Sequence, residues 1–248
     1  MRFRDRTAII TGGASGIGRA TARQLASDGA TVIIGDIDED KAEETLRELD
    51  TYETIAEFRE LDVQDEKQVN QVVDGIEAEY GVDIMINNAG VAHPSAAIEQ
   101  VSTEMRDFVI DTNAIGVWNG SQAVIPHLKS QGDGVIVNTA SVAGLTGLPQ
   151  QAAYSLSKGA VLNFTRAIAN ELGPYGVRAN AVCPGFIDTP LIGGDDDSAE
   201  VAQERGSANP MGRIGKPEEV ASCITFLASD DASFVNGHGL VVDGGTLS

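Results

Sequence analysis

The stretch Thr11-Gly12-Gly13-Ala14-Ser15-Gly16-Ile17-Gly18 follows a short β-branched run and opens a helical pattern that continues to Asp28. Glycine lets the backbone turn sharply and approach other groups closely, and the free amides at a helix N-terminus attract negative charge. A glycine-rich turn between a strand and a helix is typical of pyrophosphate binding. The spacing here is Gly-x-x-x-Gly-x-Gly, which differs from the more widespread Gly-x-Gly-x-x-Gly. We therefore predict that a dinucleotide binds at Gly12, Ser15, Gly16, Ile17 and Gly18.

Short β-branched runs alternate with longer amphipathic segments along the whole chain, which is typical of strand-helix repeats around a parallel sheet. The expected strands are Thr7 to Ile10, Thr31 to Gly35, Thr54 to Leu61, Asp83 to Asn87, Gly134 to Asn138, Arg178 to Cys183 and Gly239 to Val242. The expected helices begin near Gly16, Glu39, Glu66, Thr103, Ala152 and Pro217. No linker divides the 248 residues, so we predict one α/β domain over residues 1 to 248.

One segment, Ile187 to Met211, breaks this alternation. It contains Gly193-Gly194, the acidic run Asp195-Asp-Asp197 and two prolines. Loops at the carboxyl ends of parallel strands are where ligands bind in open α/β sheets. We expect an acidic substrate lid around residues 187 to 211, with an ordinary surface loop as the alternative.

Composition excludes several classes of protein. Apolar residues make up 42% of the chain without a run of about eighteen, so no membrane span is expected. The N-terminus leads directly into the first strand-like run, which indicates a cytoplasmic protein. Cys183 and Cys223 lie in apolar segments, and His93, His127 and His238 lack the spacing of metal ligands. We therefore predict neither a disulfide framework nor a metal site.

The net charge of -20 and the pI near 4.3 are strongly acidic. This sign is wrong for binding phosphate backbones, so nucleic acid is not an expected partner. An acidic, lysine-poor surface suits a salt-rich cytoplasm, where counterions screen the self-repulsion. We expect a halophilic source, and simple acidic drift is the alternative.

An acid closes the second expected strand, because Asp36 follows Ile33-Ile34-Gly35 some twenty residues after the glycines. A carboxylate there can accept hydrogen bonds from the adenosine ribose hydroxyls and would repel a 2′-phosphate. Neither Ser15 nor Ile37, its expected neighbours, is basic. We therefore predict NAD(H) as the cofactor, with Asp36 and Ile37 beside the ribose, and Asp38 as a helix cap.

Tyr154 and Lys158 stand four residues apart, which places a phenol and an ammonium on one face of a helix. A phenol titrates near ~10, and a neighbouring cation favours the phenolate. Lowering that pKa toward ~7 takes roughly 4 kcal/mol, of which one lysine supplies a part. Taken alone, this spacing is common.

The motifs together resemble the short-chain dehydrogenase/reductase family in order and spacing over essentially the whole chain. They are Thr11-Gly12 to Gly18, Asp62-Val63, Asn87-Asn88-Ala89-Gly90, Asn113, Ser141, Tyr154-x-x-x-Lys158 and Pro184-Gly185. The resemblance implies a single doubly wound Rossmann-type domain whose seven parallel strands are flanked by helices. It also implies a homotetramer built from the helices containing Asn113 and Tyr154 and from the C-terminal strand.

The resemblance implies four catalytic residues. Tyr154 would exchange a proton with the substrate oxygen, and Ser141 would hydrogen-bond that oxygen. Lys158 would lower the pKa of Tyr154 and hold the nicotinamide ribose. Asn113 would bind a water that leads from Lys158 to solvent.

The resemblance also implies further cofactor contacts. Asp62 would accept the adenine amino group beside the amide of Val63, and Asn88, Ala89 and Gly90 would pass close to the riboses. The nicotinamide would lie against Pro184, Gly185, Ile187 and Thr189.

The expected reaction interconverts a neutral secondary alcohol and its ketone, because the expected pocket residues are mostly apolar and no Arg or Lys is fixed near the reacting centre to bind a carboxylate or phosphate. These pocket residues are Ala92, His93, Ser95, Val142, Leu145, Leu148, Gln151, Phe186 and the loop from Leu191 to Met211. His93 or Gln151 could bind an additional hydroxyl, which keeps sugars and polyols open. The alternatives are a 3-oxoacyl-carrier-protein or 3-oxoacyl-CoA reductase, which the whole chain also resembles, and a non-catalytic NAD-sensing protein.

Overall fold

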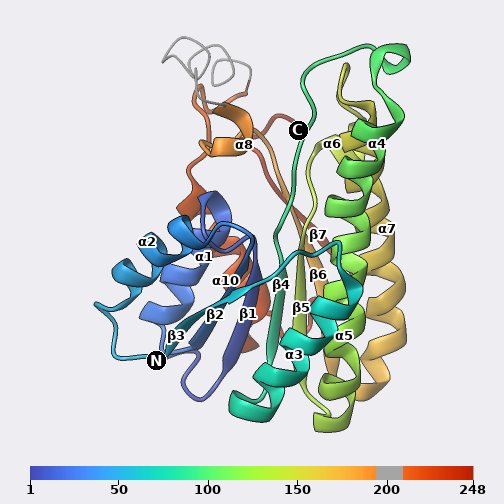
Figure 1. The fold of residues 1–248 in the computed structure, drawn as a ribbon. Helices are drawn as coiled ribbons and strands as arrows, with labels where there is room; N and C mark the ends of the chain where they lie inside the picture. Colours follow the sequence, from blue (N-terminus) through green and yellow to red (C-terminus); the bar gives the residue numbers. More distant parts are fainter. Residues whose placement is uncertain (194–208, 248) are drawn as a thin grey trace.

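A seven-stranded parallel sheet forms the centre of the molecule in the computed structural model, which describes residues 1–193 and 209–247 (Figure 1). The strands are β1 (Thr7–Thr11), β2 (Thr31–Asp36), β3 (Ala56–Glu60), β4 (Ile84–Asn87), β5 (Gly134–Thr139), β6 (Val177–Pro184) and β7 (Gly239–Val242). Their order is β3-β2-β1-β4-β5-β6-β7, and every neighbouring pair is parallel. This confirms the predicted Rossmann-type sheet.

Helices cover both faces of the sheet (Figure 1). One face carries α1 (Gly16–Ser27), α2 (Glu39–Leu49) and α10 (Pro217–Ala228), and α1 packs directly against α10. The other carries α3 (Glu66–Tyr80), α5 (Gly116–Gln131) and α7 (Ala152–Leu172), with α4 (Thr103–Ile110) above them. The short helices α6 (Ala143–Thr146) and α8 (Pro190–Gly193) lie near the carboxyl ends of the strands.

The strands have apolar side chains on both faces because both faces are buried. Ile10 and Ile34 pack into the core beneath α1 and α10, whereas Ile9 and Ile33 pack into the core beneath α3, α5 and α7. All four are fully buried. Successive residues of a strand point to opposite faces, so each strand supplies both cores.

The strand order reverses between β1 and β4, and this reversal positions the functional site. The connection from β1 runs to β2 on one side, while β4 lies on the other side of β1. In open α/β sheets, ligands bind at the carboxyl ends of the strands where the order reverses. The glycine turn after β1 and the loop after β4 meet at this point.

The predicted helix starts at Gly16, Glu39, Glu66, Thr103, Ala152 and Pro217 all agree with the structure. The sequence analysis did not separate α5 from the helix that begins at Thr103. Between them the backbone widens into a π-helical turn, Asp111–Ile115, which carries Asn113. Asp38 accepts a hydrogen bond from the Lys41 amide, which confirms the predicted helix cap.

The predicted lid is only partly described. Residues 187–193 and 209–211 belong to the described structure, whereas the acidic run Asp195-Asp-Asp197 lies outside it. Within the described ranges, every helix is too short or too polar to cross a membrane.

Candidate active site

The glycine turn joins β1 to α1 with little space to spare. Gly12 has φ of +62°, and a Cβ built on it would lie 2.7 Å from Ala89 Cα. A Cβ on Gly18 would collide with the Gly12 carbonyl oxygen. Gly16 also has positive φ, +50°. The sequence needs glycine at these positions because the turn, the helix start and the loop after β4 are in contact.

The N-terminus of α1 is open to a ligand. Ser15 is the N-cap residue, but its side chain makes no capping hydrogen bond, and no acidic residue lies in the first turn. The first amides of a helix have no partner within the helix. Together with the glycine cradle, these amides fit the pyrophosphate of a dinucleotide.

Asp36, the last residue of β2, is fixed beside this turn. Its Oδ2 accepts a hydrogen bond from the Ala14 amide at 3.0 Å, and its Oδ1 accepts one from the Ile37 amide at 2.8 Å. Ile37 is 74% exposed and places no cation next to the carboxylate. The carboxylate therefore keeps a fixed orientation and retains lone pairs for ribose hydroxyls.

The loop after β4 is bound to the glycine turn through Thr11 and Asn88. The Thr11 hydroxyl accepts hydrogen bonds from the amides of Asn88 (3.0 Å) and Ala89 (3.1 Å). The Asn88 side-chain amide donates to the carbonyl oxygens of Thr11 and Gly12. The Asn88 amide nitrogen is thus committed to the scaffold, which leaves the backbone of this loop to approach a ligand.

Tyr154 and Ser141 meet at the carboxyl end of β5. Ser141 is 7% exposed and shares a hydrogen bond with the Tyr154 side chain. Ser141 Oγ also accepts from the Ala143 amide at 3.1 Å, which fixes its position at the start of α6. Burial raises the pKa of Tyr154, and the hydrogen bond with Ser141 partly opposes this.

Lys158 lies behind Tyr154 and is 2% exposed. Its Nζ donates to the Thr139 carbonyl oxygen at 2.8 Å and lies 5.8 Å from the centre of the Tyr154 ring. Burial lowers the pKa of Lys158 to about 8. Desolvation is the largest influence on the phenol of Tyr154 and raises its pKa, so the lowering expected from Lys158 does not appear in these residues alone.

Asn113 and Lys158 face each other across Gly90. A Cβ on Gly90 would lie 3.3 Å from both Asn113 Oδ1 and Lys158 Nζ. Asn113 is fully buried, and its Nδ2 donates to the Val91 carbonyl and to Ser157 Oγ. Its Oδ1 accepts from the Val91 amide and retains one lone pair. The π-helical turn therefore holds the side-chain oxygen of Asn113 near Lys158, and Gly90, which has no side chain, leaves space between them.

The remaining predicted cofactor residues border the same end of the sheet. Thr189 packs beside Gly16, since a Cβ on that glycine would lie 3.2 Å from Thr189 Cγ2. Ile187 is buried and pairs with Gly215, and Pro184 accepts a hydrogen bond from the Val142 amide at 3.1 Å. A Cβ on Gly185 would lie 2.9 Å from Asp243 Cβ.

Asp62 and Val63, the predicted adenine contacts, follow β3. Asp62 Oδ1 accepts from the Gln64 amide at 2.9 Å, and the helix that follows is capped by Asp65 rather than by Asp62. Val63 is buried, and its carbonyl accepts from Asn119 at 2.8 Å.

Two polar side chains among the predicted pocket residues, Gln151 and His93, are held in place near the N-terminus of α7. Gln151 Nε2 donates to the His93 carbonyl at 2.6 Å, and the His93 ring is 96% buried. Leu145 and Leu148 are exposed in the described structure. Among the predicted pocket residues, these two leucines are therefore apolar and exposed, whereas His93 and Gln151 are polar and held in place.

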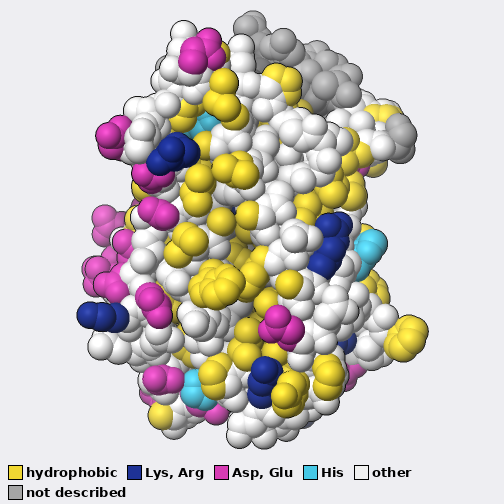
Figure 2. All heavy atoms as spheres, turned by 90° about the vertical axis from the view of Figure 1, so that its right-hand side faces the viewer, with side chains coloured by type: hydrophobic (Ala, Val, Ile, Leu, Met, Phe, Trp, Pro, Cys, Tyr) yellow, Lys and Arg dark blue, Asp and Glu magenta, His cyan; other side chains and the backbone are white. Residues whose placement is uncertain are grey.

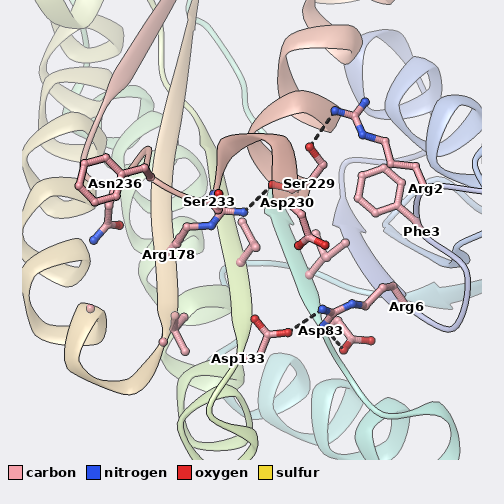
Figure 3. A pocket seen from close by; sticks show the side chains of 17 residues that line it. Arg2, Phe3, Arg6, Asp83, Asp133, Arg178, Ser229, Asp230, Ser233 and Asn236 are labelled. Carbon is pink, nitrogen blue, oxygen red and sulfur yellow. Dashed lines mark hydrogen bonds and ion pairs between the residues drawn. The ribbon is translucent and has the colours of Figure 1, made fainter.

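A separate cavity of about 530 Å³ lies at the opposite, amino end of the sheet (Figure 3). Its arginines are already engaged, because Arg6 binds Asp83 and Asp133, Arg2 binds Asp231, and Arg178 donates to two backbone carbonyls. None of the predicted site residues lines it. We interpret these paired groups as structural contacts that join the first residues of the strands to the end of α10.

Sequence reasoning missed two residues that organise the site, Thr11 and Thr139. Thr11 holds the loop after β4 with its hydroxyl, and Thr139 binds Lys158 with its backbone carbonyl. Both are the last residues of their strands, Thr11 of β1 at the reversal in strand order and Thr139 of β5, two strands away. This position at the carboxyl end of a strand is a signal that could have indicated a role for them.

This fold and site define a Rossmann-type protein with its functional groups at the reversal in strand order. Residues 12–246 match the family described as enoyl-(acyl carrier protein) reductase. The chain is 41% identical to a 3-oxoacyl-[acyl-carrier-protein] reductase of Thermotoga maritima, with all of both chains covered. It is 42% identical to cis-4-hydroxycyclohexanecarboxylate dehydrogenase of Sinomonas cyclohexanicum, covering 98% of this chain and 97% of that one. The crystal structure of levodione reductase superposes with a TM-score of 0.94 at 36% identity, covering 98% of each chain.

The chain therefore belongs to the short-chain dehydrogenase/reductase family, whose members are oxidoreductases.

Proposed function

We propose that the protein is an NAD(H)-dependent oxidoreductase that interconverts a neutral secondary alcohol and its ketone. The observation that carries this proposal is the hydrogen-bonded pair of Tyr154 and Ser141, with the buried ammonium of Lys158 behind it. The pair stands at the carboxyl end of β5, two strands from the glycine turn. A phenol and a hydroxyl directed at one oxygen can exchange a proton with it and position its carbon.

Tyr154 would donate its proton to the carbonyl oxygen during reduction and accept one from the alcohol during oxidation. Ser141 would hydrogen-bond the same oxygen and hold it within reach of the phenol. The nicotinamide ring, when bound, supplies or accepts the hydride. Lys158 would hold the adjacent ribose and return a proton to Tyr154, and Asn113 would orient a water over Gly90 toward Lys158.

The cofactor would be held by the open amides of α1 and by the groups around them. These residues are Gly12, Ser15, Gly16, Ile17, Gly18, Asp36, Ile37, Asp62, Val63, Asn88, Ala89, Gly90, Tyr154, Lys158, Pro184, Gly185, Ile187 and Thr189. The oriented carboxylate of Asp36 supports NAD(H) over NADP(H), because it would repel a 2′-phosphate and the nearby Lys41 is already paired with Asp38.

The experiment that tests this proposal is a substrate panel assayed with each cofactor. We expect oxidation of simple secondary alcohols with NAD⁺ and a kcat/KM at least about 10-fold lower with NADP⁺. A preference for NADP⁺ would remove the role given to Asp36, and failure to oxidise any alcohol would refute the proposed reaction.

A 3-oxoacyl thioester reductase is the second candidate, and the full-length similarity to the Thermotoga maritima reductase favours it. An acidic carrier protein needs unpaired basic residues for docking. Near the carboxyl end of the described strands, Arg106 pairs with Asp107, and Arg213 pairs with Glu219 at 2.6 Å. This pairing and the net charge of -20 weigh against carrier docking. A non-catalytic NAD-sensing protein is less consistent with the complete set of Tyr154, Lys158, Ser141 and Asn113.

We propose a homotetramer as the working form. Figure 2 shows apolar side chains grouped over the face built by α4, α5 and α7. The exposed ones there are Met105, Phe108, Ile115, Trp118 and Leu156. The edge strand β7 leaves Val241 39% exposed and offers a second contact. Two separate apolar faces on one chain suit an assembly with two kinds of two-fold interface.

We further propose a salt-rich cytoplasm as the setting. The acidic surface supports it, because counterions at high ionic strength screen repulsion within a chain of net charge -20. Both cysteines are free thiols, which suits a reducing compartment. Activity measured from ~0.1 to ~3 M KCl tests the salt requirement, and a protein unharmed by low salt would contradict it.

A further inference from the structure

Two buried polar atoms beside the active site lack a hydrogen-bond partner within residues 1–193 and 209–247. They are His93 Nε2 and Gln151 Oε1. Buried polar atoms are nearly always paired, and an unpaired one at a ligand site indicates a group that the ligand supplies. The identity of that group follows from whether these two atoms donate or accept.

With a single ring proton, His93 is an acceptor at Nε2. Its Nδ1 lies 2.8 Å from the Pro94 carbonyl oxygen, which can only accept, so the proton of the neutral ring resides on Nδ1. The other nitrogen, Nε2, then carries a lone pair.

Gln151 is an acceptor for a similar reason. Its Nε2 donates to the His93 carbonyl oxygen at 2.6 Å, and this contact fixes which end of the side-chain amide is nitrogen. The end without a partner is therefore Oε1, which can only accept.

Both residues are anchored beside the reacting phenol. Gln151 is the N-cap residue of α7, one helical turn before Tyr154. The His93 loop is bound to Asn113 through Val91, and to the residue before Gln151 by the hydrogen bond from the Ala96 amide to the Gln150 carbonyl at 3.1 Å. The two acceptors thus belong to a rigid wall, not to a loose surface loop.

We propose that His93 Nε2 and Gln151 Oε1 recognise hydroxyl groups next to the reacting carbinol, so that the preferred substrate is a diol or polyol. This inference rests on the proposed alcohol oxidation. A hydroxyl proton satisfies either acceptor, whereas the hydrocarbon of a simple alcohol and the carbonyl oxygens of a 3-oxoacyl thioester satisfy neither. A site built to bind a hydroxyl selects against analogues that lack it, because its own polar groups are then left unpaired.

The test compares cyclohexanol with cyclohexane-1,2-diol and cyclohexane-1,3-diol as substrates, with NAD⁺ in excess. We expect kcat/KM for the better diol, divided by two for its two carbinol carbons, to exceed that for cyclohexanol about 10-fold or more. His93→Phe keeps a ring and removes the acceptor, so it should reduce kcat/KM for the diol about 10-fold more than for cyclohexanol. His127→Phe is the matched control, since that ring pairs with Asp74 on α3 and should leave the ratio unchanged.

The outcomes separate the two proposals. Equal kcat/KM for cyclohexanol and both diols in the unaltered protein would overturn the hydroxyl recognition while alcohol oxidation stands. If His93→Phe leaves the ratio of kcat/KM for the diol over cyclohexanol unchanged, the hydroxyl recognition is overturned as well. If His93→Phe loses NADH binding or melts early, the same comparison in Gln151→Met decides in its place. If neither alcohol nor diol is oxidised, the proposed reaction fails and the hydroxyl recognition fails with it.

Discussion

Lys158 donates a hydrogen bond from Nζ to the carbonyl oxygen of Thr139 at 2.8 Å, in a position where the lysine is 2% exposed. One carbonyl cannot replace the water that an ammonium loses on burial, which is why the pKa of Lys158 falls to about 8. The chain keeps a costly buried charge at the point where the proposed chemistry needs a cation beside the phenol and the ribose. Function and stability are thus opposed at this residue.

The first prediction concerns stability and pH. Because burial depresses the folded-state pKa of Lys158, folding favours its neutral form, and the cost of the buried charge is largest below about pH 8. The free energy of unfolding of the unaltered protein should rise relative to Lys158→Met by about 2 kcal/mol between pH 7 and pH 9.5. Denaturant titrations of both proteins across this range measure the difference, and parallel pH profiles would contradict it.

The second prediction concerns the acid/base group. Tyr154→Phe should lower kcat by roughly 10²- to 10⁴-fold, because the proton exchanged with the substrate oxygen is lost. NADH binding, followed by fluorescence, should change little, since the ring remains. Tyr175→Phe, an exposed tyrosine at the far end of α7, serves as the control. Normal turnover in Tyr154→Phe would eliminate the mechanism.

The third prediction concerns cofactor choice. Asp36→Asn removes the charge and keeps one acceptor oxygen, which can serve one of the two amides, Ala14 or Ile37, that now bind separate oxygens. The ratio of kcat/KM for NAD⁺ over NADP⁺ should fall about 10- to 150-fold. Asp38→Asn is the matched control, because asparagine caps a helix as well as aspartate does. Equal ratios in the two variants would show that Asp36 does not select the cofactor.

Much of the fold could be predicted from the sequence because its signals are local. Strands buried on both faces, such as Ile9-Ile10 and Ile33-Ile34, leave continuous apolar runs, and Asp38 marks a helix start by its side chain. The division between α4 and α5 could not be predicted, because the π-helical turn around Asn113 contains no glycine or proline that would mark a break.

The site residues followed from motif order, but their electrostatics did not. The Lys158 partner is a backbone carbonyl, which the identity of Thr139 does not reveal. The pKa of Tyr154 is raised by burial among residues distant in the chain, which the spacing of Tyr154 and Lys158 does not reveal. The Lys158 partner and the Tyr154 pKa both depend on tertiary packing, which brings together residues that are far apart in the chain.

The fourth prediction concerns the space between Asn113 and Lys158. Gly90→Ala places a methyl group 3.3 Å from both Asn113 Oδ1 and Lys158 Nζ, where the proposed water would bind. Because this group would displace the water, kcat should fall roughly 10-fold or more while the pKa seen in the pH profile of kcat shifts. Gly75→Ala on α3, where nothing lies within 4 Å, is the control. An unchanged pH profile in Gly90→Ala would show that no proton passes this way.

The fifth prediction concerns assembly. Trp118 belongs to the apolar face over α4, α5 and α7 and is 50% exposed, and the centre of its ring lies 5.3 Å from that of Phe164. Placing a carboxylate there would bury a charge in the interface, so Trp118→Glu should reduce the mass in solution from a tetramer to a dimer or monomer. Light scattering at fixed protein and salt concentration measures this, and circular dichroism verifies that the variant is folded. Ile55→Glu, at an exposed position before β3, should leave the mass unchanged, because that surface belongs to neither proposed interface. If the unaltered protein is a monomer, or if Trp118→Glu stays a tetramer, the face over α4, α5 and α7 is not the interface.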